Sequence, residues 1–304
     1  MLTHLKGYIL NWHLHWFLPH GESQRKELPM AKSYDELQFT DDFMFGKVME
    51  DRELCRDVLE CLLQEPVGTL QNMQQEREFQ YTSDGKPIRL DVYTKDSDTV
   101  YDAEMQNLNH KKVADLELPK RSRFYQSMMD VDFLQKGNSY QDLPEGKILF
   151  ICTFDPFGKK IPRYTFRNKC DEDGTLSLYD ETWKIFCNCT ASTASLPESL
   201  KDLYEYISTG VANSPLTQRI AASVETIKKN EKWRSEYMKE WIIIDDARRE
   251  GINQGIEQGI YAFIHDKLDD GVDAETIIAK LQKSFSLTRE DAEKYLASVN
   301  HCIL

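Results

Sequence analysis

The sequence has no long apolar run, no excess of positive charge and no paired cysteine motif. No stretch of about 18 or more apolar residues occurs, so neither a membrane-spanning helix nor a membrane partner is expected. Lys and Arg number 38 against 51 Asp and Glu, which gives a formal net charge of −13. This balance argues against broad electrostatic adhesion to nucleic acid or to an anionic membrane, although it is compatible with a local basic cleft.

The seven cysteines are scattered through the chain, and their number is odd. No C-x-x-C pair occurs, which excludes zinc-ribbon spacing and argues against a disulfide framework. The one close pair, Cys187-x-Cys189, has the spacing of two residues packed on one face of a strand. We therefore expect reduced thiols in a cytoplasmic protein.

Residues 1–29 differ in character from the rest of the chain. They hold four of the seven histidines and lack the clean apolar segment and small-residue cleavage site of a secretory leader. His13-x-His15 could hold a metal in an extended segment, but no carboxylate or thiol lies nearby in the sequence. We expect this segment to lie outside the folded core and translation to begin at Met30.

From Tyr34 onward the sequence shows helical and strand-like patterns. Apolar residues recur at helical spacing over 43–62, with Thr40 or Asp41 as the N-cap. A continuous apolar run over 147–154 predicts a strand buried on both faces. Further helices are expected over 118–135, 273–285 and 288–299, and further strands over 76–81, 88–94, 99–106, 163–167, 176–179 and 183–187. The simplest division is an α/β domain over 34–190, a helical extension over 196–249 and a C-terminal region over 250–304.

Two consecutive strands carry an unusual row of acids. Side chains alternate between the two faces of a strand. The apolar face of the first strand consists of Ile88, Leu90 and Val92. If the two strands pair with their apolar faces together, Asp91 lies on the same face as Asp102, Glu104 and Gln106 of the second strand. Carboxylates this close repel unless a cation or a shared proton compensates. Oxygen ligands of this kind suit Mg²⁺, although a solvated acidic edge has the same spacing.

Five short motifs follow one another along the chain. They are T-D-D-F-M-F at 40–45, R-L-D-V-Y at 89–93, D-A-E-M-Q at 102–106, P-K-R-S-R-F-Y-Q at 119–126 and N-S-Y-Q-D-L-P-E-G-K-I-L-F-I at 138–151. In this order they resemble the recombination-promoting nuclease/transposase (Rpn) family of the PD-(D/E)XK nuclease superfamily. The resemblance implies a restriction-endonuclease-like α/β core, a mixed sheet flanked by helices, followed by a helical C-terminal region.

The resemblance also implies roles for four residues. It assigns Asp91 and Glu104 as ligands of Mg²⁺ or Mn²⁺, and it makes Asp42 the helix-borne acid that takes a metal-bound water or a second ion. Gln106 stands where the broader superfamily has Lys. A neutral amide can orient water but adds no positive charge beside the nucleophile.

Basic residues on and before the next helix are expected to contact DNA phosphates. The residues assigned to DNA binding are Lys111, Lys112, Arg121, Arg123 and Tyr125, of which Arg121 and Tyr125 match the family's R-x-x-x-Y helix. Asp115 and Glu117 interleave with them, so a solvated helical face is the alternative.

The C-terminal region contains a four-residue repeat, E-G-I-N-Q-G-I-E-Q-G-I at 250–260. Glycine costs a helix about 1 kcal/mol per position, so three glycines in one stretch need a compensating gain. A self-association helix that forms a homo-oligomer is one interpretation, and a hinge-like tether is the other.

Together these features predict a metal-dependent DNA endonuclease linked to DNA mobility or recombination. The alternative is a catalytically weak or inactive DNA-binding or assembly protein of a mobile element or defence system. The three acids Asp42, Asp91 and Glu104 favour the enzyme, whereas Gln106 and the net charge favour the alternative.

Overall fold

The computed structural model describes residues 32–79, 88–107, 117–134 and 137–301. Within these residues six strands form one sheet, in the order β1-β2-β3-β4-β6-β5. The strands are β1 (Gln71–Phe79), β2 (Ile88–Lys95), β3 (Thr99–Gln106), β4 (Glu145–Cys152), β5 (Arg163–Phe166) and β6 (Thr182–Asn188). The pairs β3–β4 and β4–β6 are parallel and the other pairs are antiparallel, which confirms the expected mixed sheet.

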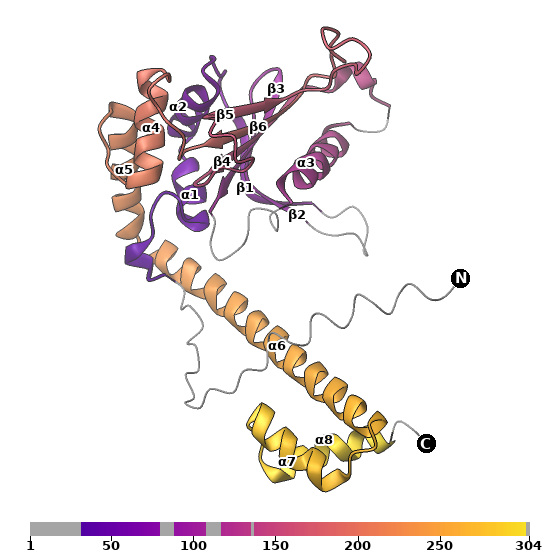
Figure 1. Ribbon diagram of the computed structural model, residues 1–304. Helices are drawn as coiled ribbons and strands as arrows, with labels where there is room; N and C mark the ends of the chain where they lie inside the picture. The colour runs from indigo at the N-terminus through magenta and orange to yellow at the C-terminus, as the bar shows by residue number, and fades with distance from the viewer. Residues whose placement is uncertain (1–31, 80–87, 108–116, 135–136, 302–304) are drawn as a thin grey trace. The chain divides into compact units, whose positions relative to one another are not determined.

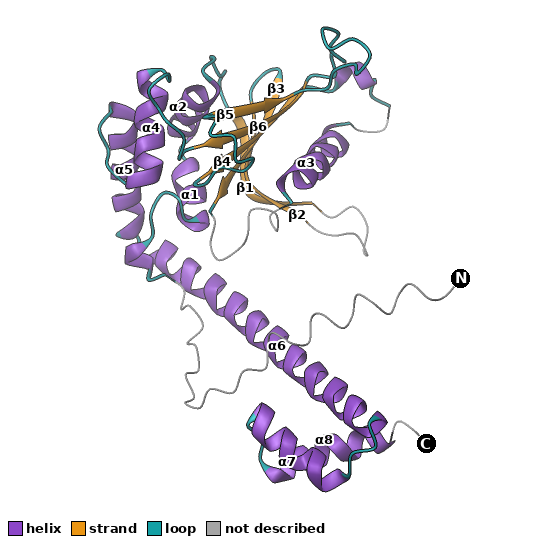
Figure 2. Ribbon diagram, in the orientation of Figure 1, coloured by secondary structure: helices purple, strands orange, loops and turns teal. Residues whose placement is uncertain are grey.

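Helices cover both faces of this sheet (Figures 1 and 2). One face packs against α1 (Asp42–Met49), α2 (Arg52–Leu63), α4 (Glu198–Thr209) and α5 (Pro215–Lys228), and the other packs against α3 (Leu118–Phe133). Strand β4 is buried on both sides, as its apolar run predicts. Leu149 and Ile151 join the first core, whereas Ile148 and Phe150 join the second.

The expectation of one continuous helix over 43–62 is wrong. Asp41 is the N-cap residue of α1, but the helix ends at Met49 and α2 begins at Arg52. The Asp51 carboxylate accepts hydrogen bonds from the amides of Glu53 and Leu54 and so caps a new helix. Apolar spacing continues across this break, so periodicity alone did not reveal it.

The expectation of a strand over 176–179 is also wrong. The segment between β5 and β6 has a single isolated bridge, between Lys169 and Ser177. Tyr179 and Glu181 have φ values of 56° and 52°, which are left-handed conformations incompatible with a strand. Leu176 and Leu178 are therefore exposed rather than packed against the sheet.

The C-terminal helices form a small core of their own. They are α6 (Glu231–Asp269), α7 (Ala274–Phe285) and α8 (Arg289–His301), and the last two confirm the expected pair. Their core contains Ile260, Ile264, Ile277 and Leu281. At its N-terminal end α6 contacts the sheet-containing core through Tyr237, whose ring lies 5.2 Å from that of Phe43. None of the described helices is long and apolar enough to cross a membrane.

Candidate active site

The regular antiparallel pairing of β2 and β3 ends at Val92, and at Asp91 side chain to backbone hydrogen bonds connect the two strands. The regular register runs from Lys95 opposite Val100 to Val92 opposite Ala103. At the next position the Asp91 amide donates to Glu104 Oε1 at 3.0 Å, and the Met105 amide donates to Asp91 Oδ2 at 3.1 Å. Two side chain to backbone hydrogen bonds thus hold these carboxylates against the neighbouring strand. The expected juxtaposition of Asp91 and Glu104 is confirmed.

The same irregularity overturns one expectation about the strand faces. Leu90 packs with Tyr93 and Val100 in the core beneath α3, whereas Val92 packs in the core on the opposite face. The prediction that Leu90 and Val92 share a face is therefore wrong. The regular β2–β3 ladder, on which strict alternation depends, ends between these two residues.

The acidic residues of β3 are buried beneath α3. Asp102 is 0%, Glu104 1% and Gln106 8% exposed. This burial excludes the solvated acidic edge as an explanation of the pattern. No backbone, hydroxyl, amide or cationic group of the described residues donates to either Asp102 oxygen, and the neighbouring partner of this carboxyl is the Glu104 carboxyl. Burying two adjacent carboxyls is costly unless a cation or a shared proton compensates it.

Burial raises the pKa of both buried carboxyls. The pKa of Asp102 lies well above its usual range because of burial and then because of the charge of Asp91. The pKa of Glu104 is raised by burial and then by the charge of Asp102. Without a cation the site therefore favours the protonated forms of these carboxyls, which is the situation in which neighbouring carboxylates share protons or bind a cation.

Among the described residues, Arg121 of α3 brings a positive charge next to these acids. Its Nη2 donates to Glu104 Oε2 at 3.2 Å, and its Nη1 donates to Gln106 Oε1 at 3.0 Å. Nη2 also donates to the Tyr125 hydroxyl at 2.8 Å. Residues four apart lie on one helical face, so the R-x-x-x-Y spacing places Arg121 and Tyr125 together over the end of β3.

This arrangement of strands, acids and helix agrees with the comparison to known families. Residues 39–171 match the family model described as PD-(D/E)XK nuclease family transposase. This segment is a PD-(D/E)XK nuclease family domain. The match runs from before α1 to beyond β5 and includes all nine predicted site residues. Comparison with curated proteins and with solved structures returns no match.

The predicted helix-borne acid of the PD-(D/E)XK domain, Asp42, lies at the surface. Asp42 is exposed and is the first residue of α1. The start of α1 is tied to the end of β3, because the Asn107 side-chain amide donates to the Thr40 carbonyl. Asn107 is a residue that sequence reasoning missed, since an Asn after a strand carries no distinctive signal.

The predicted DNA-binding residues separate into three groups. Arg123 is exposed on α3, where it can meet a phosphate. Tyr125 is 7% exposed and its hydroxyl accepts from Arg121, so both residues of this pair face the acids. Lys111 and Lys112 lie outside the described residues, as do His13 and His15.

The donor set of the PD-(D/E)XK domain fits a hard divalent cation. Its possible ligands are carboxylate and amide oxygens, the type that Mg²⁺ and Mn²⁺ prefer. Asp102 is buried beside Glu104 and receives no hydrogen bond from a cationic or amide donor, so a cation bound here would compensate its charge. The described residues contain no ready-made cage of three or more His, Cys, Asp or Glu side chains, so water or backbone carbonyls would complete the coordination.

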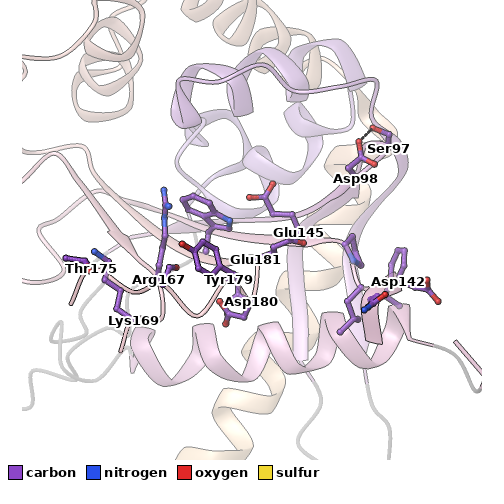
Figure 3. Close-up of a pocket in the computed structure, with 17 residues that line it drawn as sticks. Ser97, Asp98, Asp142, Glu145, Arg167, Lys169, Thr175, Tyr179, Asp180 and Glu181 are labelled. Atoms are coloured by element: carbon purple, nitrogen blue, oxygen red, sulfur yellow. Dashed lines mark hydrogen bonds between the residues drawn. The ribbon is translucent and has the colours of Figure 1, made fainter. Parts of the chain in front are cut away.

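A cavity of about 870 Å³ lies elsewhere on the domain, near the first residues of β4 and β6. Figure 3 shows Glu145 and Glu181 in its middle, with Arg167 and Lys169 to one side. Acidic side chains outnumber basic ones along its wall, and it contains none of the predicted site residues. It is therefore separate from the carboxylate cluster and unsuited to a phosphate backbone.

Proposed function

We propose that this protein is a metal-dependent DNA endonuclease that hydrolyses phosphodiester bonds. The observation that carries the proposal is the cross-strand pair of Asp91 and Glu104, together with the buried Asp102 beside it. The family match supports a PD-(D/E)XK nuclease or transposase type of function. We link its action to DNA mobility or recombination, because the family description names a transposase. We place this action in the cytoplasm, as the scattered, unpaired cysteines of the sequence led us to expect.

Asp91 and Glu104 would hold the cation, which would be Mg²⁺ or Mn²⁺. When bound, such an ion polarises a phosphoryl oxygen and lowers the pKa of an attacking water. The hydrogen bonds from the Met105 and Asp91 amides fix the two carboxylates in advance, so little reorganisation is needed on binding. Asp102 would add negative charge behind them and strengthen the preference for a divalent ion.

Gln106 and Arg121 together would replace the lysine found elsewhere in the superfamily, one by orienting water and the other by supplying positive charge. The Gln106 amide can orient a water, and its oxygen is held by Arg121 Nη1. The Arg121 guanidinium supplies the positive charge that the amide lacks, next to the position where negative charge develops in the transition state. Arg121 would thus position Glu104 and Gln106 rather than serve as the DNA contact expected from the sequence.

DNA would approach over the exposed side of α3. Lys120 and Arg123 are exposed there and can contact phosphates. Lys111 and Lys112 precede the helix in sequence and are the other residues that we assign to phosphate contacts. Such local contacts would allow DNA binding despite the net charge of −13.

Nicking of supercoiled plasmid in Mg²⁺ or Mn²⁺ tests the proposal. We expect cleavage by the wild type and a loss of at least about 100-fold in Asp91→Asn and Glu104→Gln, which remove the charge but keep the shape. Asp98→Asn, a change at an acid of the separate cavity, is the matched control and should cleave normally. If DNA binds but no metal supports cleavage, the protein is instead an inactive DNA-binding or assembly accessory.

A further inference from the structure

The middle of α6 has no packing partner in the part of the chain that the structure describes. This helix spans 39 residues, and its buried residues, Ile260 and Ile264, lie near its C-terminal end. Between them and the first turns it contains Gly251, Gly255 and Gly259, each of which costs a helix about 1 kcal/mol. Isolated helices are marginally stable in water even without glycine. The stretch from 238 to 258 therefore needs contacts that a single copy does not provide.

One face of this stretch carries a heptad seam. Its members follow one another at alternating spacings of four and three residues, the repeat of a two-stranded coiled coil. They are Met238, Ile242, Asp245, Arg249, Ile252 and Ile256. The four apolar members are 46%, 50%, 37% and 49% exposed, in chain order. Asp245 and Arg249 form the polar centre of the seam, with 2.7 Å between Oδ2 and Nη2.

The seam is symmetric about the level of residue 247. In an antiparallel pair related by a twofold axis at that level, Met238 faces Ile256 of the partner subunit and Ile242 faces Ile252 of the partner subunit. Asp245 then faces Arg249 of the partner subunit, so every apolar residue meets an apolar residue and every charge meets its opposite. A parallel pair in register would instead stack Asp245 on itself and Arg249 on itself, which repels.

We propose that the α6 seam binds a second copy of this chain in an antiparallel coiled coil centred on Asp245 and Arg249. The interface buries Ile242, Ile252 and Ile256 and replaces the intrahelical ion pair with ion pairs across the twofold axis. It assigns a partner and a register to the helix that contains the glycine repeat. This inference does not depend on nuclease activity.

Light scattering on the full-length protein tests the assembly. We expect a mass twice the 35.5 kDa of one chain. Asp245→Arg places four arginines at the centre and should raise the dissociation constant about tenfold or more. The double variant Asp245→Arg/Arg249→Asp restores opposite charges and should restore the dimer. Asp246→Arg makes the same charge change outside the seam and should leave the dimer intact. A monomeric wild type, with the seam covered by another part of its own chain, would overturn the proposal.

Disulfide trapping tests the register. In the antiparallel arrangement, Ile242→Cys/Ile252→Cys should form a covalent dimer under mild oxidation, above the level seen in wild type. Neither single variant should do so, because each new thiol faces an isoleucine. Crosslinking of the single variants would show a parallel pair, and no crosslinking in any variant would show that the seam does not meet a second copy. Either result would contradict the proposal.

Discussion

Arg121 gives the sharpest test of how the site is organised. Its guanidinium donates to Glu104 at 3.2 Å and to Gln106 at 3.0 Å, so it brings a positive charge into contact with the buried Glu104 carboxylate. Arg121→Ala removes both hydrogen bonds and the charge. Losing one electrostatic donor at a reacting centre costs about 3–4 kcal/mol, so kcat should fall about 100-fold or more. Because Arg121 holds residues of the site, KM for DNA should change little.

The second half of this test restores a positive charge to the site by a substitution at residue 106. Gln106→Lys in the Arg121→Ala background places an ammonium on the same strand face, and we expect it to recover at least about tenfold of the lost rate. Plasmid nicking at saturating Mg²⁺ gives kcat and KM for each variant, and thermal unfolding checks that each is folded. If Arg121→Ala instead raises KM with kcat unchanged, Arg121 is simply a DNA contact. A folded double variant with no recovery would refute the charge-supplying role.

Two further predictions concern stability. Asp96 accepts hydrogen bonds from the amides of Gly68, Asp98 and Thr99 and from the Tyr101 hydroxyl, at 2.9–3.1 Å. Asp96→Asn should lower the free energy of unfolding at pH 7 by about 2 kcal/mol, measured by urea denaturation. Burial raises the pKa of Asp96, but these donors lower it more, so its net pKa is below the usual value. This stabilisation is therefore present above the unfolded pKa of about 4 and is lost as the pH falls through the folded value. A difference between the two proteins that stays constant down to pH 2 would contradict this reasoning. Asp102→Asn should raise the midpoint of thermal unfolding in EDTA by about 2–4 °C, because a buried carboxyl beside Asp91 and Glu104 is replaced by a neutral amide. A lower midpoint would mean that Asp102 has a stabilising partner.

The positions of strands could be predicted from the sequence where polar and apolar residues alternate clearly or where an apolar run is continuous. The bounds of β3 are the expected ones, because apolar and polar residues alternate from Tyr101 to Gln106 and a polar turn precedes Thr99. The buried run of β4 was equally clear. The juxtaposition of Asp91 with Glu104 was expected from alternation in both strands, but it occurs where the alternation of β2 breaks, between Leu90 and Val92.

Other features depend on contacts that no local pattern encodes. The break between α1 and α2 rests on the side-chain cap of Asp51, within an unbroken apolar periodicity. Spacing placed Arg121 and Tyr125 on one helical face, but only the packing of α3 on the sheet turns that face toward Glu104. The burial of Asp102 likewise depends on α3, although its position two residues before Glu104 on the same strand face was a usable signal.

Calorimetric titration of the metal-free protein with Mn²⁺ tests the central claim most directly, which is that Asp91 and Glu104 together hold a divalent cation. Wild type should take up the cation, and both Asp91→Asn and Glu104→Gln should lose that uptake, whereas Asp98→Asn should bind as wild type does. Uptake that survives in both site variants, or no uptake by folded wild type, would contradict the account.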